Sequence, residues 1–361
     1  MNVLINIVAD TDSRKKWANN VALKFFNSKI ELFSNFSESV DIIILGLGGG
    51  ANYKFLLKFH QYINKKKPKK RPIIISGFNG STDTCNIHAL LCRMGSDFIC
   101  LNSKKDFESF SEQLQKLNFS NHTLKLTGLA RKYYKIEKST KDKIVFFAQP
   151  DVPKTKRERI YIVKKLDELA KKFPEKKVYI KPRSKKGTLN ITHKEKYYYQ
   201  DILKKLKVKN VNLIYDDVET ILQSVDLSIS VGSTVAFESI YNEIDTAVLS
   251  DFGIRQEYGN HHFIGSGCLL SFDNLINNKR PYIIEEWKAQ HVLINEDKFA
   301  LLVEDVLKKI QKQKENNQIL ALERLYYNKY NAPYFYKNNI RIISTKNNIF
   351  STLKNFLKGN N

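Results

Sequence analysis

The sequence predicts an α/β protein built from two Rossmann-like, doubly wound domains that face each other across a cleft. Short runs of consecutive apolar residues, rich in isoleucine and valine, alternate with stretches of helical spacing. Such continuous runs are typical of parallel strands buried on both faces. The alternation occurs twice, on either side of a charged segment without an apolar face, Ala130–Lys143. We therefore expect one domain in residues 1–135, a second in 143–305 and a basic helical tail in 306–361.

The first domain is expected to alternate strands and helices from its beginning. Its strands are predicted at Val3–Ala9, Val40–Gly50, Arg71–Gly80 and Ser96–Ser103, the second of them running into a glycine turn. Helical spacing predicts helices over 17–26 and 52–63. Binding residues in such folds lie in the loops beyond the carboxyl ends of the strands.

The second domain repeats this pattern. Strands are predicted at Ile144–Pro150, Lys177–Arg183 and Val211–Asp217. Helices are predicted between them, over 157–173, 198–206 and 218–225. The stretch Leu227–Gly253 then continues as strand, turn, helix and strand, which completes the second sheet.

The turn in this last stretch is Gly232-Ser233-Thr234, directly before helical spacing begins. Small hydroxyl residues are preferred caps at helix starts, so we expect Ser233 or Thr234 to cap this helix. The backbone amides of a first helical turn have no partner within the helix and attract anions. The turn is therefore a candidate anion site.

The composition is strongly basic. The 361 residues include 60 Lys and Arg against 37 Asp and Glu, a net charge of +23. Such a charge favours polyanions: nucleic acid, an anionic membrane, or phosphorylated and acidic substrates. The alternative is a lysine-rich surface that reflects an AT-rich genome. The run Lys65–Arg71 prompts a nucleic-acid hypothesis, but it has no interleaved aromatic residues and no known binding motif, so no nucleic-acid partner is predicted.

The four cysteines indicate no metal centre. Cys85, Cys92, Cys100 and Cys268 have no paired metal-ligand spacing, which predicts reduced thiols in a cytoplasmic protein without a metal or another cofactor. The N-terminus is too short and wrongly flanked for a signal peptide, and no apolar run is long enough to span a bilayer. The oligomeric state is not predicted.

The end of the tail is amphipathic. Its helical pattern places Ile349, Phe350, Leu353, Phe356 and Leu357 on one face, opposite Lys354 and Lys358. That arrangement suits a peripheral helix on an anionic membrane. The alternative is a tail that packs back on the N-terminal domain.

Basic residues follow a strand in the second domain. Lys181 and Arg183 lie at a predicted carboxyl end, where they could meet a phosphate or a carboxylate, Arg183 in a bidentate way. His193 follows on the same loop as a donor to a phosphate or a general acid. The alternatives are generic surface charge for the first two and a structural histidine for the third.

Carboxylates occupy the loops of the first domain. Asp10 and Asp12 end the first strand, and Asp83 lies on a similar loop. A carboxylate facing the cleft could serve as the general base that deprotonates an acceptor hydroxyl. The alternative for Asp12, or for Ser13 beside it, is a helix N-cap.

The glycine turn of the first domain matches no nucleotide motif. Gly46, Gly48, Gly49 and Gly50 have neither the spacing of a Walker loop nor that of a dinucleotide fingerprint. Glycines still let a ligand approach the backbone closely. A ligand-facing loop and a plain tight turn both remain open.

These segments resemble a glycosyltransferase of the GT-B type. The unit "VGSTVAFESIYNEIDTAVLSDFG" is similar to the donor-phosphate segment of that superfamily. The resemblance implies that Gly232, Ser233, Thr234 and Glu238 lie at the donor phosphate. The segment "YDDVETILQSVDLSIS" resembles the part that precedes it, which implies a nucleoside near Tyr215–Val218.

A narrower resemblance rests on "FFAQPDVPKTKRER" with "YIKPRSKKGTLNITH", together with "ISGFNG" and "CLNSKKDF". These segments resemble a poorly characterised bacterial family of surface-polysaccharide glycosyltransferases, over roughly residues 1–275. Functionally related sialyltransferases and Kdo transferases use CMP-activated acidic sugars. Their usual His-Pro pair is absent, and Lys181-Pro182-Arg183 with Thr192-His193 occupies comparable ground.

Residue patterns and resemblance together assign the following roles. The catalytic candidates are Asp10, Asp12, Asp83 and His193. The donor-binding candidates are Gln149, Lys181, Arg183, Thr192, Tyr215, Asp217, Gly232, Ser233, Thr234 and Glu238. The acceptor-side loops contain Gly48, Gly49, Gly50, Asn79 and Gly80, and no metal is expected.

The expected activity is metal-independent transfer of a CMP-activated, sialic-acid-like or Kdo-like sugar to a lipooligosaccharide or capsule acceptor. We expect it in the cytoplasm, at the inner face of the cytoplasmic membrane, with a nucleotide-sugar and a glycan or glycolipid as partners. UDP- and GDP-sugars remain open as donors. The alternative functions are a nucleotide-sugar epimerase or hydrolase on the same fold and a basic nucleic-acid-binding protein.

Overall fold

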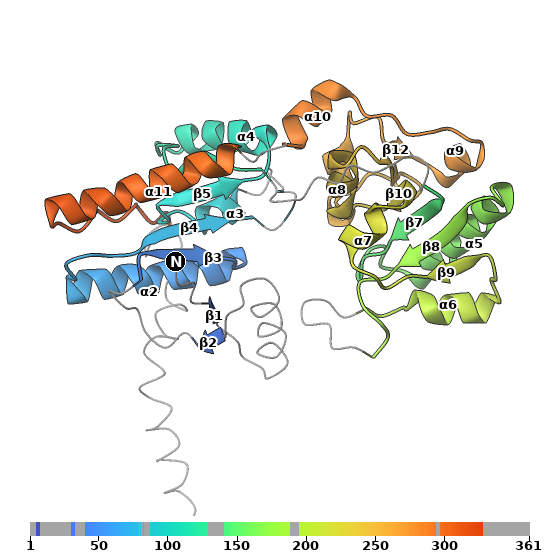
Figure 1. Cartoon of the computed structure of the whole chain (residues 1–361), viewed down its shortest axis with the longest axis horizontal. Helices are drawn as coiled ribbons and strands as arrows, with labels where there is room; N and C mark the ends of the chain where they lie inside the picture. Colours follow the sequence, from blue (N-terminus) through green and yellow to red (C-terminus); the bar gives the residue numbers. More distant parts are fainter. Residues whose placement is uncertain are drawn as a thin grey trace, which may run out of the picture. The chain divides into compact units, whose positions relative to one another are not determined.

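The computed structural model describes residues 5–7, 30–32, 40–78, 80, 82, 87–128, 141–187, 195–293 and 297–327. By its internal contacts the chain divides into two compact units (Figure 1). The first unit comprises Phe36–Gly128 and Asn295–Asn361, and the second comprises Met1–Asn35 and Leu129–Ile294. Strands β1 (Ile5–Ile7) and β2 (Ile30–Leu32) pair in parallel as a separate two-stranded sheet.

The described part of the first unit contains a four-stranded parallel sheet in the order β3-β4-β5-β6. Its strands are β3 (Ile42–Leu45), β4 (Ile73–Gly77), β5 (Phe98–Leu101) and β6 (Leu124–Leu126). The helices between them are α2 (Gly49–Lys66), α3 (His88–Leu91) and α4 (Lys104–Lys116). Because each right-handed crossover steps to the next strand in the same direction, these helices are expected on one face of the sheet.

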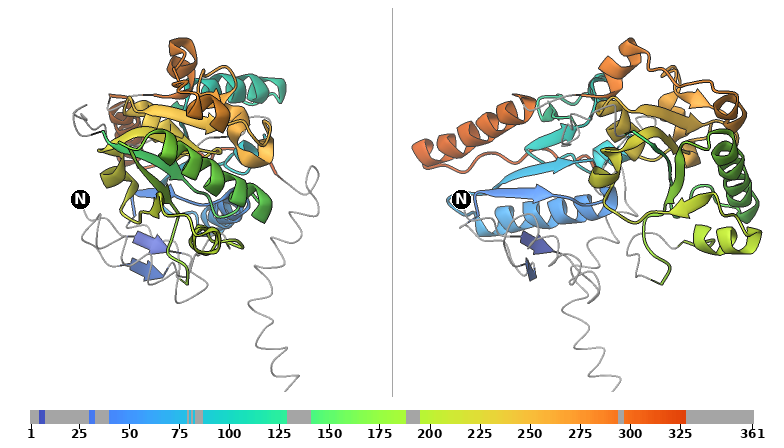
Figure 2. Two further views of the ribbon diagram at one scale, coloured as in Figure 1. Left: turned by 90° about the vertical axis from the view of Figure 1, so that its right-hand side faces the viewer. Right: turned by 45° about the vertical axis from the view of Figure 1, so that its right-hand side comes forward.

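The other face of this sheet is covered by α11 (Asp297–Asn316), as Figure 2 shows. Successive residues of a strand point to opposite faces. Ile73 and Ile75 accordingly pack with residues of α11, whereas Ile74 packs with residues of α2. The continuous isoleucine run of β4 is therefore explained by burial on both sides.

The second unit contains a six-stranded parallel sheet in the order β12-β11-β10-β7-β8-β9. Its strands are β7 (Lys143–Phe147), β8 (Lys177–Lys181), β9 (Val211–Leu213), β10 (Val225–Ser230), β11 (Asp245–Leu249) and β12 (Leu269–Leu270). The chain adds β8 and β9 on one side of β7, then returns to the other side for β10, β11 and β12. This is the Rossmann strand order.

Helices cover both faces of the second sheet (Figure 1). One face packs against α5 (Lys156–Lys172), α6 (Tyr199–Leu206) and α9 (Phe272–Ile276). The other packs against α7 (Val218–Leu222), α8 (Val235–Tyr241) and α10 (Glu285–His291). Two 3₁₀ turns, η2 (Gln256–Tyr258) and η3 (Asn260–Phe263), follow β11.

The predicted fold class is confirmed, since both units are built on parallel sheets with helices on both faces. The expected cleft and the domain boundaries stay predictions. One helix, α11, runs through residue 305, where the sequence placed a boundary, and packs on the first sheet. The predicted helix over 17–26, residues 129–140 of the predicted linker and the amphipathic end of the tail lie outside the described residues.

Candidate functional site

The strand order of the second sheet reverses between β7 and β10. In open α/β sheets, ligands bind beyond the carboxyl ends of the strands at such a reversal. All strands of this sheet are parallel, so the loops after β7 and β10 meet at one edge. These loops are residues 148–155 and 231–234, and they contain the predicted donor residues Gln149, Gly232, Ser233 and Thr234.

The turn after β10 is packed so tightly that only glycine fits at its first position. A Cβ on Gly232 would lie 2.0 Å from the backbone oxygen of Tyr258 and 2.9 Å from the backbone nitrogen of Asn260. Ser233 lies one residue before the N-cap, and its Oγ accepts a hydrogen bond from the amide of Val235, the first residue of α8, at 3.3 Å. Thr234 is the N-cap residue by position, as predicted for this pair, but its side chain makes no capping hydrogen bond.

Two polar atoms beside the reversal have no hydrogen-bond partner among the described residues. Gln149 Oε1, two residues beyond β7, and Ser230 Oγ, at the end of β10, are both buried and unpaired. Buried polar atoms are normally hydrogen-bonded, because leaving one unpaired costs about 1–3 kcal/mol. Unpaired atoms at a ligand-binding edge are therefore candidates for ligand contacts.

The loop after β7 is held by Arg159, a residue that the sequence analysis did not select. Its guanidinium is buried and donates hydrogen bonds to Glu195 Oε1 at 2.6 Å and to four backbone oxygens, those of Gln149, Pro150, Pro153 and Tyr197. Five acceptors match the five N–H donors of a guanidinium. We call Arg159 with Glu195 the site clamp.

The carboxyl partner of this clamp is not fully stabilised as an anion. Burial raises the pKa of Glu195, and the neighbouring Arg159 charge and its hydrogen bond only partly oppose that effect. Asp151 raises the pKa of Glu195 further. The pairing with Arg159 therefore only partly offsets the cost of burying the Glu195 carboxylate.

A second set of missed residues ties η2 to the start of α5. The hydroxyl of Tyr258 donates to Glu158 Oε1 at 2.6 Å, and Glu158 forms a capping box with Thr155. Burial, together with this bond to Glu158, raises the pKa of Tyr258 to about 12. Tyr258 is the residue whose backbone oxygen faces Gly232, so the turn after β10 and the start of α5 are braced through one side chain.

The remaining donor candidates extend along the same edge. Lys181 ends β8, Tyr215 and Asp217 follow β9, and all three are on the described chain. Burial lowers the pKa of Lys181, while Asp217 and Asp216 oppose this. Neighbouring strands lie about 4.8 Å apart, so the ends of β10 and β9 are roughly 14 Å apart. Only an extended ligand could touch both ends.

The outer residues of this edge differ in exposure. Arg183 is exposed, whereas Tyr215 is half-buried, with the Lys185 ammonium 5.4 Å from its ring centroid. Glu238 lies in the first turn of α8 and is half-buried. Nine of the ten donor candidates thus lie at or next to strand ends along one edge of this sheet, and the tenth, Thr192, lies outside the described residues.

At the carboxyl edge of the first sheet, the glycine turn precedes and begins α2. A Cβ on Gly48 or Gly50 would meet no described atom within 4 Å, and one on Gly49 would make ordinary contacts with Cys92. The φ angles of Gly48, Gly49 and Gly50 lie outside the left-handed region that favours glycine, and the described neighbours leave room for a side chain. Glycine is therefore not required at these positions. Gly80 differs, since its φ of 103° favours glycine and its oxygen accepts from Asn102 Nδ2 at 2.5 Å.

Asp106 is a buried carboxyl group at this edge that the sequence analysis missed. It lies in the first turn of α4, and its amide donates to Ser103 Oγ at 3.0 Å. Burial raises the pKa of Asp106 to about 6, against opposing hydrogen bonds from Ser103 and Thr82. The spacing Ser103-x-x-Asp106 is typical of a helix start, but nothing local in the sequence indicates that Asp106 is buried.

Six predicted site residues lie outside the described chain: Asp10, Asp12, Asn79, Asp83, Thr192 and His193. The predicted base and acid therefore stay predictions. Within the described residues, no group of three or more His, Cys, Asp or Glu side chains could hold a metal ion. No helix in this described part is long and apolar enough to cross a membrane.

Comparison with known proteins gives one family match. The model described as "Putative glycosyltransferase (DUF6716)" matches residues 30–307. No curated protein matches the chain.

Several solved structures are similar at low sequence identity. The UDP-GlcNAc 2-epimerase from Neisseria meningitidis bound to UDP-GlcNAc is 14% identical, with 80% of this chain and 88% of that chain covered and a TM-score of 0.44. The S. aureus MnaA–UDP co-structure is 12% identical, covering 84% and 88%, with a TM-score of 0.46. The pneumococcal O-GlcNAc transferase GtfA in complex with UDP and GlcNAc is 12% identical, covering 73% and 59%, with a TM-score of 0.42.

Proposed function

The chain belongs to the DUF6716 family, and on that premise we propose that it transfers a sugar from a nucleotide-sugar to a glycan acceptor. One observation carries the proposal beyond the family description: the strand order of the second sheet reverses beside the turn Gly232-Ser233-Thr234. The donor would bind at this reversal, and the acceptor at the glycine turn of the first unit.

The donor phosphate is assigned to the turn after β10. The positive end of the α8 dipole favours an anion at this turn. The amides of Val235, Ala236 and Phe237 already donate to Ser233 and Thr234, so the contacts to a phosphate are assigned to the turn Gly232-Ser233-Thr234 itself. The nucleoside would extend along the edge toward Tyr215 and Asp217, a distance that suits an extended nucleotide rather than a single small anion. Lys181 and Arg183 would add positive potential between these ends.

The proposed reaction is one displacement at the anomeric carbon. An acceptor hydroxyl attacks this carbon, and the bond to the donor phosphate breaks with its electron pair staying on the nucleotide. A carboxylate among Asp10, Asp12 and Asp83 takes the hydroxyl proton, and His193 is the candidate acid at the phosphate. The α8 start and the basic side chains would stabilise the leaving phosphate, which is why we propose transfer without a metal.

We retain a CMP-linked acidic sugar as the proposed donor, with a lipooligosaccharide or capsule acceptor at the inner face of the cytoplasmic membrane. The support is the net charge of +23, which suits an anionic donor and an anionic membrane. UDP- and GDP-sugars are the alternatives. The rival nucleic-acid hypothesis loses part of its basis, because Arg71 of the run Lys65–Arg71 is buried and bonded to Asp97.

The test is thermal stabilisation by CMP, CDP, UDP, GDP and ADP at matched ionic strength. A ligand specific for the folded state stabilises it by about 2.7 kcal/mol at one hundred times its Kd. We expect one nucleotide to raise the Tm, and Ser233→Ala/Thr234→Ala to abolish that rise. The control Ser109→Ala/Ser111→Ala, which also removes two hydroxyls but in the first unit, should retain it.

Each outcome has a defined meaning. CMP selectivity supports the acidic-sugar donor, and UDP or GDP selectivity replaces that donor while keeping the site. If no nucleotide raises the Tm, the donor site is wrong. Consumption of the nucleotide-sugar without any acceptor would identify an epimerase or a hydrolase instead of a transferase.

A further inference from the structure

The first unit has a cavity at the amino end of its sheet, the end opposite to the glycine turn. It measures about 230 Å³, many times the roughly 15 Å³ that one water needs. Its walls come from the turn before β4 and from the C-terminal half of α11, and include Lys69, Lys70, Gln313 and Lys314. Two segments more than two hundred residues apart in sequence therefore form it together.

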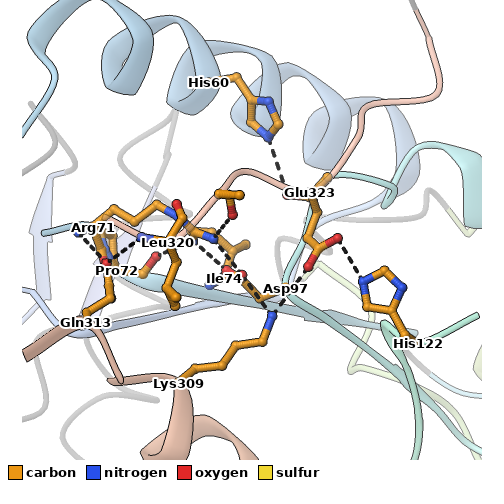
Figure 3. Close-up of polar contacts among 12 residues, drawn as sticks. His60, Arg71, Pro72, Ile74, Asp97, His122, Lys309, Gln313, Leu320 and Glu323 are labelled. Carbon is orange, nitrogen blue, oxygen red and sulfur yellow. Dashed lines mark hydrogen bonds and ion pairs between the residues drawn. The ribbon is translucent and has the colours of Figure 1, made fainter. Parts of the chain in front are cut away.

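The floor of this cavity is held in place by hydrogen bonds (Figure 3). Arg71 donates to both carboxylate oxygens of Asp97, each at 2.7 Å. The buried Gln313 side chain accepts from the amide of Arg71 at 3.2 Å and donates to its oxygen at 2.9 Å. The floor is thus neutralised and rigid, so the charge available to a ligand comes from the walls.

The walls are positively charged. Lys70 lies 3.3 Å from Asp41, with both side chains about half exposed. Lys69 and Lys314 have no ion pair among the described residues and are exposed at the cavity. An unpaired lysine is a mobile point charge that suits a phosphate oxygen. The cavity therefore fits an anionic group of phosphate size.

An exposed apolar surface lies beside this cavity. Val303, Leu307, Ile310 and Lys314 follow each other at intervals of four, three and four residues, so they share one flank of α11. Val303 is 43% exposed and Leu307 is 56% exposed, and Ile310 and Lys314 line the cavity. This flank therefore runs from aliphatic side chains into the basic cavity.

Strand β3 adds to this apolar surface. Ile42 packs with residues of α11, and Ile44, two residues on, points to the same face of the sheet but is 74% exposed. Exposed aliphatic side chains beside basic residues are typical of a surface that inserts at a lipid interface. The charge of the cavity selects the kind of lipid, since it is complementary to an anionic headgroup.

We propose that this flank and cavity, the lipid surface, bind an anionic phospholipid of a bilayer. The headgroup phosphate lies between Lys69 and Lys314, and the hydrocarbon contacts Leu307 and Val303. The surface is distinct from the proposed donor site, and its test needs no sugar transfer. Its failure and the failure of the proposed function are therefore distinguishable.

The experiment is sedimentation of the full chain with vesicles of phosphatidylcholine alone or with about one third phosphatidylglycerol. We expect binding only with phosphatidylglycerol. Lys69→Gln/Lys314→Gln should weaken it about 30-fold, since each lysine near an anionic surface contributes a factor of about five. Leu307→Gln should weaken it several-fold with an unchanged Tm. The control Lys172→Gln/Lys209→Gln removes two exposed lysines of the second unit and should cost less than about threefold.

Three results would overturn the proposal. Equal losses in the control and in Lys69→Gln/Lys314→Gln would mean that net charge alone attracts the protein. Displacement from vesicles by an excess of inorganic phosphate at constant ionic strength would identify a soluble anion as the occupant. A Tm lowered by many degrees in Leu307→Gln would mean that another part of the chain or a second copy covers this surface.

Discussion

Among the described residues, each unit has a buried arginine that forms an ion pair with a buried carboxylate, and the two arginines hold different segments of the chain in place. In the first unit, Arg71 pairs with Asp97 at the amino ends of β4 and β5 and donates to the oxygens of Leu320 and Ala321 (Figure 3). We call this pair the tail clamp, because it fastens the segment that follows α11. In the second unit, the site clamp of Arg159 and Glu195 fastens loops at the carboxyl edge, where ligands bind.

The carboxylates of the two clamps differ in how well they are stabilised. Burial alone would raise the pKa of Asp97, but two bonds from Arg71 and one from the amide of Ile74 outweigh it and lower the pKa. At Glu195, burial outweighs a single bond from Arg159, and the pKa is raised. The tail clamp is therefore a satisfied structural pair, whereas the site clamp keeps a costly anion near the proposed donor site.

The largest effect is expected from breaking the tail clamp. Arg71→Met removes the two short bonds to the buried Asp97 and leaves it only the longer Lys309 contact at 3.4 Å and the Ile74 amide. Removing one partner of a buried ion pair typically costs about 3–5 kcal/mol. Urea unfolding should show this loss, and the Tm rise with the bound nucleotide should persist, because the clamp holds no part of the donor site. Because the pKa of Asp97 is lowered, its contribution is present at neutral pH and is lost as pH falls through the folded pKa.

A double variant sharpens this prediction. Arg71→Met/Asp97→Leu removes both buried charges, and replacing a whole buried pair by apolar residues is often neutral. It should therefore recover most of the loss seen in Arg71→Met. A double variant that is less stable than the single one would show that the bonds to Leu320 and Ala321, rather than the ion pair, hold this region.

Breaking the site clamp should lower the free energy of unfolding less than breaking the tail clamp does, but it should impair nucleotide binding. Arg159→Lys keeps the charge but cannot reach all five acceptors, and we expect a loss of about 2–3 kcal/mol. Because the loop containing Gln149 is no longer held, the Tm rise with nucleotide should disappear. A variant that is destabilised but binds nucleotide with unchanged Kd would reduce Arg159 to a structural residue with no role in positioning the site.

The burial of Arg159 could have been predicted from the sequence, whereas the burial of Arg71 could not. Arg159 shares helical spacing with Ile162, Val163 and Leu166, so a charged residue on the apolar face of a helix could have been identified as buried. Arg71 ends the run Lys65–Arg71 and looks like its neighbours. Its partner Asp97 precedes a different strand, and only the pairing of β4 with β5 brings the two together.

The same reason limits what could be predicted of the candidate site. Continuous apolar runs predicted the two parallel sheets, and strand ends predicted which loops gather at one edge. The contact between Gly232 and Tyr258 depends on how η2 folds back after β11, which local spacing does not encode. Burial of Asp106 likewise depends on residues distant in the sequence.

Substitution of Asp106 should change stability less than the clamp variants do, and it should stabilise the fold rather than destabilise it. Its folded pKa of about 6 lies above its ordinary value of 3.8, so the ionised form costs the folded state about 3 kcal/mol above pH 6. This cost is relieved as pH falls from about 6 to 3.8. Asp106→Asn should therefore raise the free energy of unfolding by about 1–3 kcal/mol at pH 8, with a smaller gain at pH 5.

Urea unfolding at these two pH values tests the assignment. A variant that is less stable at pH 8 would mean that the ionised carboxylate is stabilised in the fold, contrary to the burial argument. If the expected gain in stability is accompanied by loss of transfer, Asp106 is a residue that serves the activity at a cost to stability.

The smallest change in stability is expected for Gly50→Ala. This variant tests whether the glycine turn is a ligand-facing loop or a plain tight turn. An alanine there meets no described atom within 4 Å and lies in the first turn of α2, so Gly50→Ala should stabilise the fold by about 0.5–1 kcal/mol. Gly232→Ala is the contrasting variant, because its Cβ would lie 2.0 Å from an oxygen and should destabilise the second unit. Urea unfolding of both variants measures this difference.

Activity then separates the two interpretations of the turn. If an acceptor approaches the backbone at Gly48–Gly50, the methyl group of Gly50→Ala occupies part of its path, and KM for the acceptor should rise while nucleotide binding is unchanged. An unchanged KM in a stabilised variant would make the segment a plain tight turn. The glycines would then have no demonstrated use, since neither φ nor packing among the described residues requires them. Higher stability together with an unchanged KM in Gly50→Ala would therefore argue that the acceptor binds at the loops that follow β4 and β5 rather than at the turn after β3.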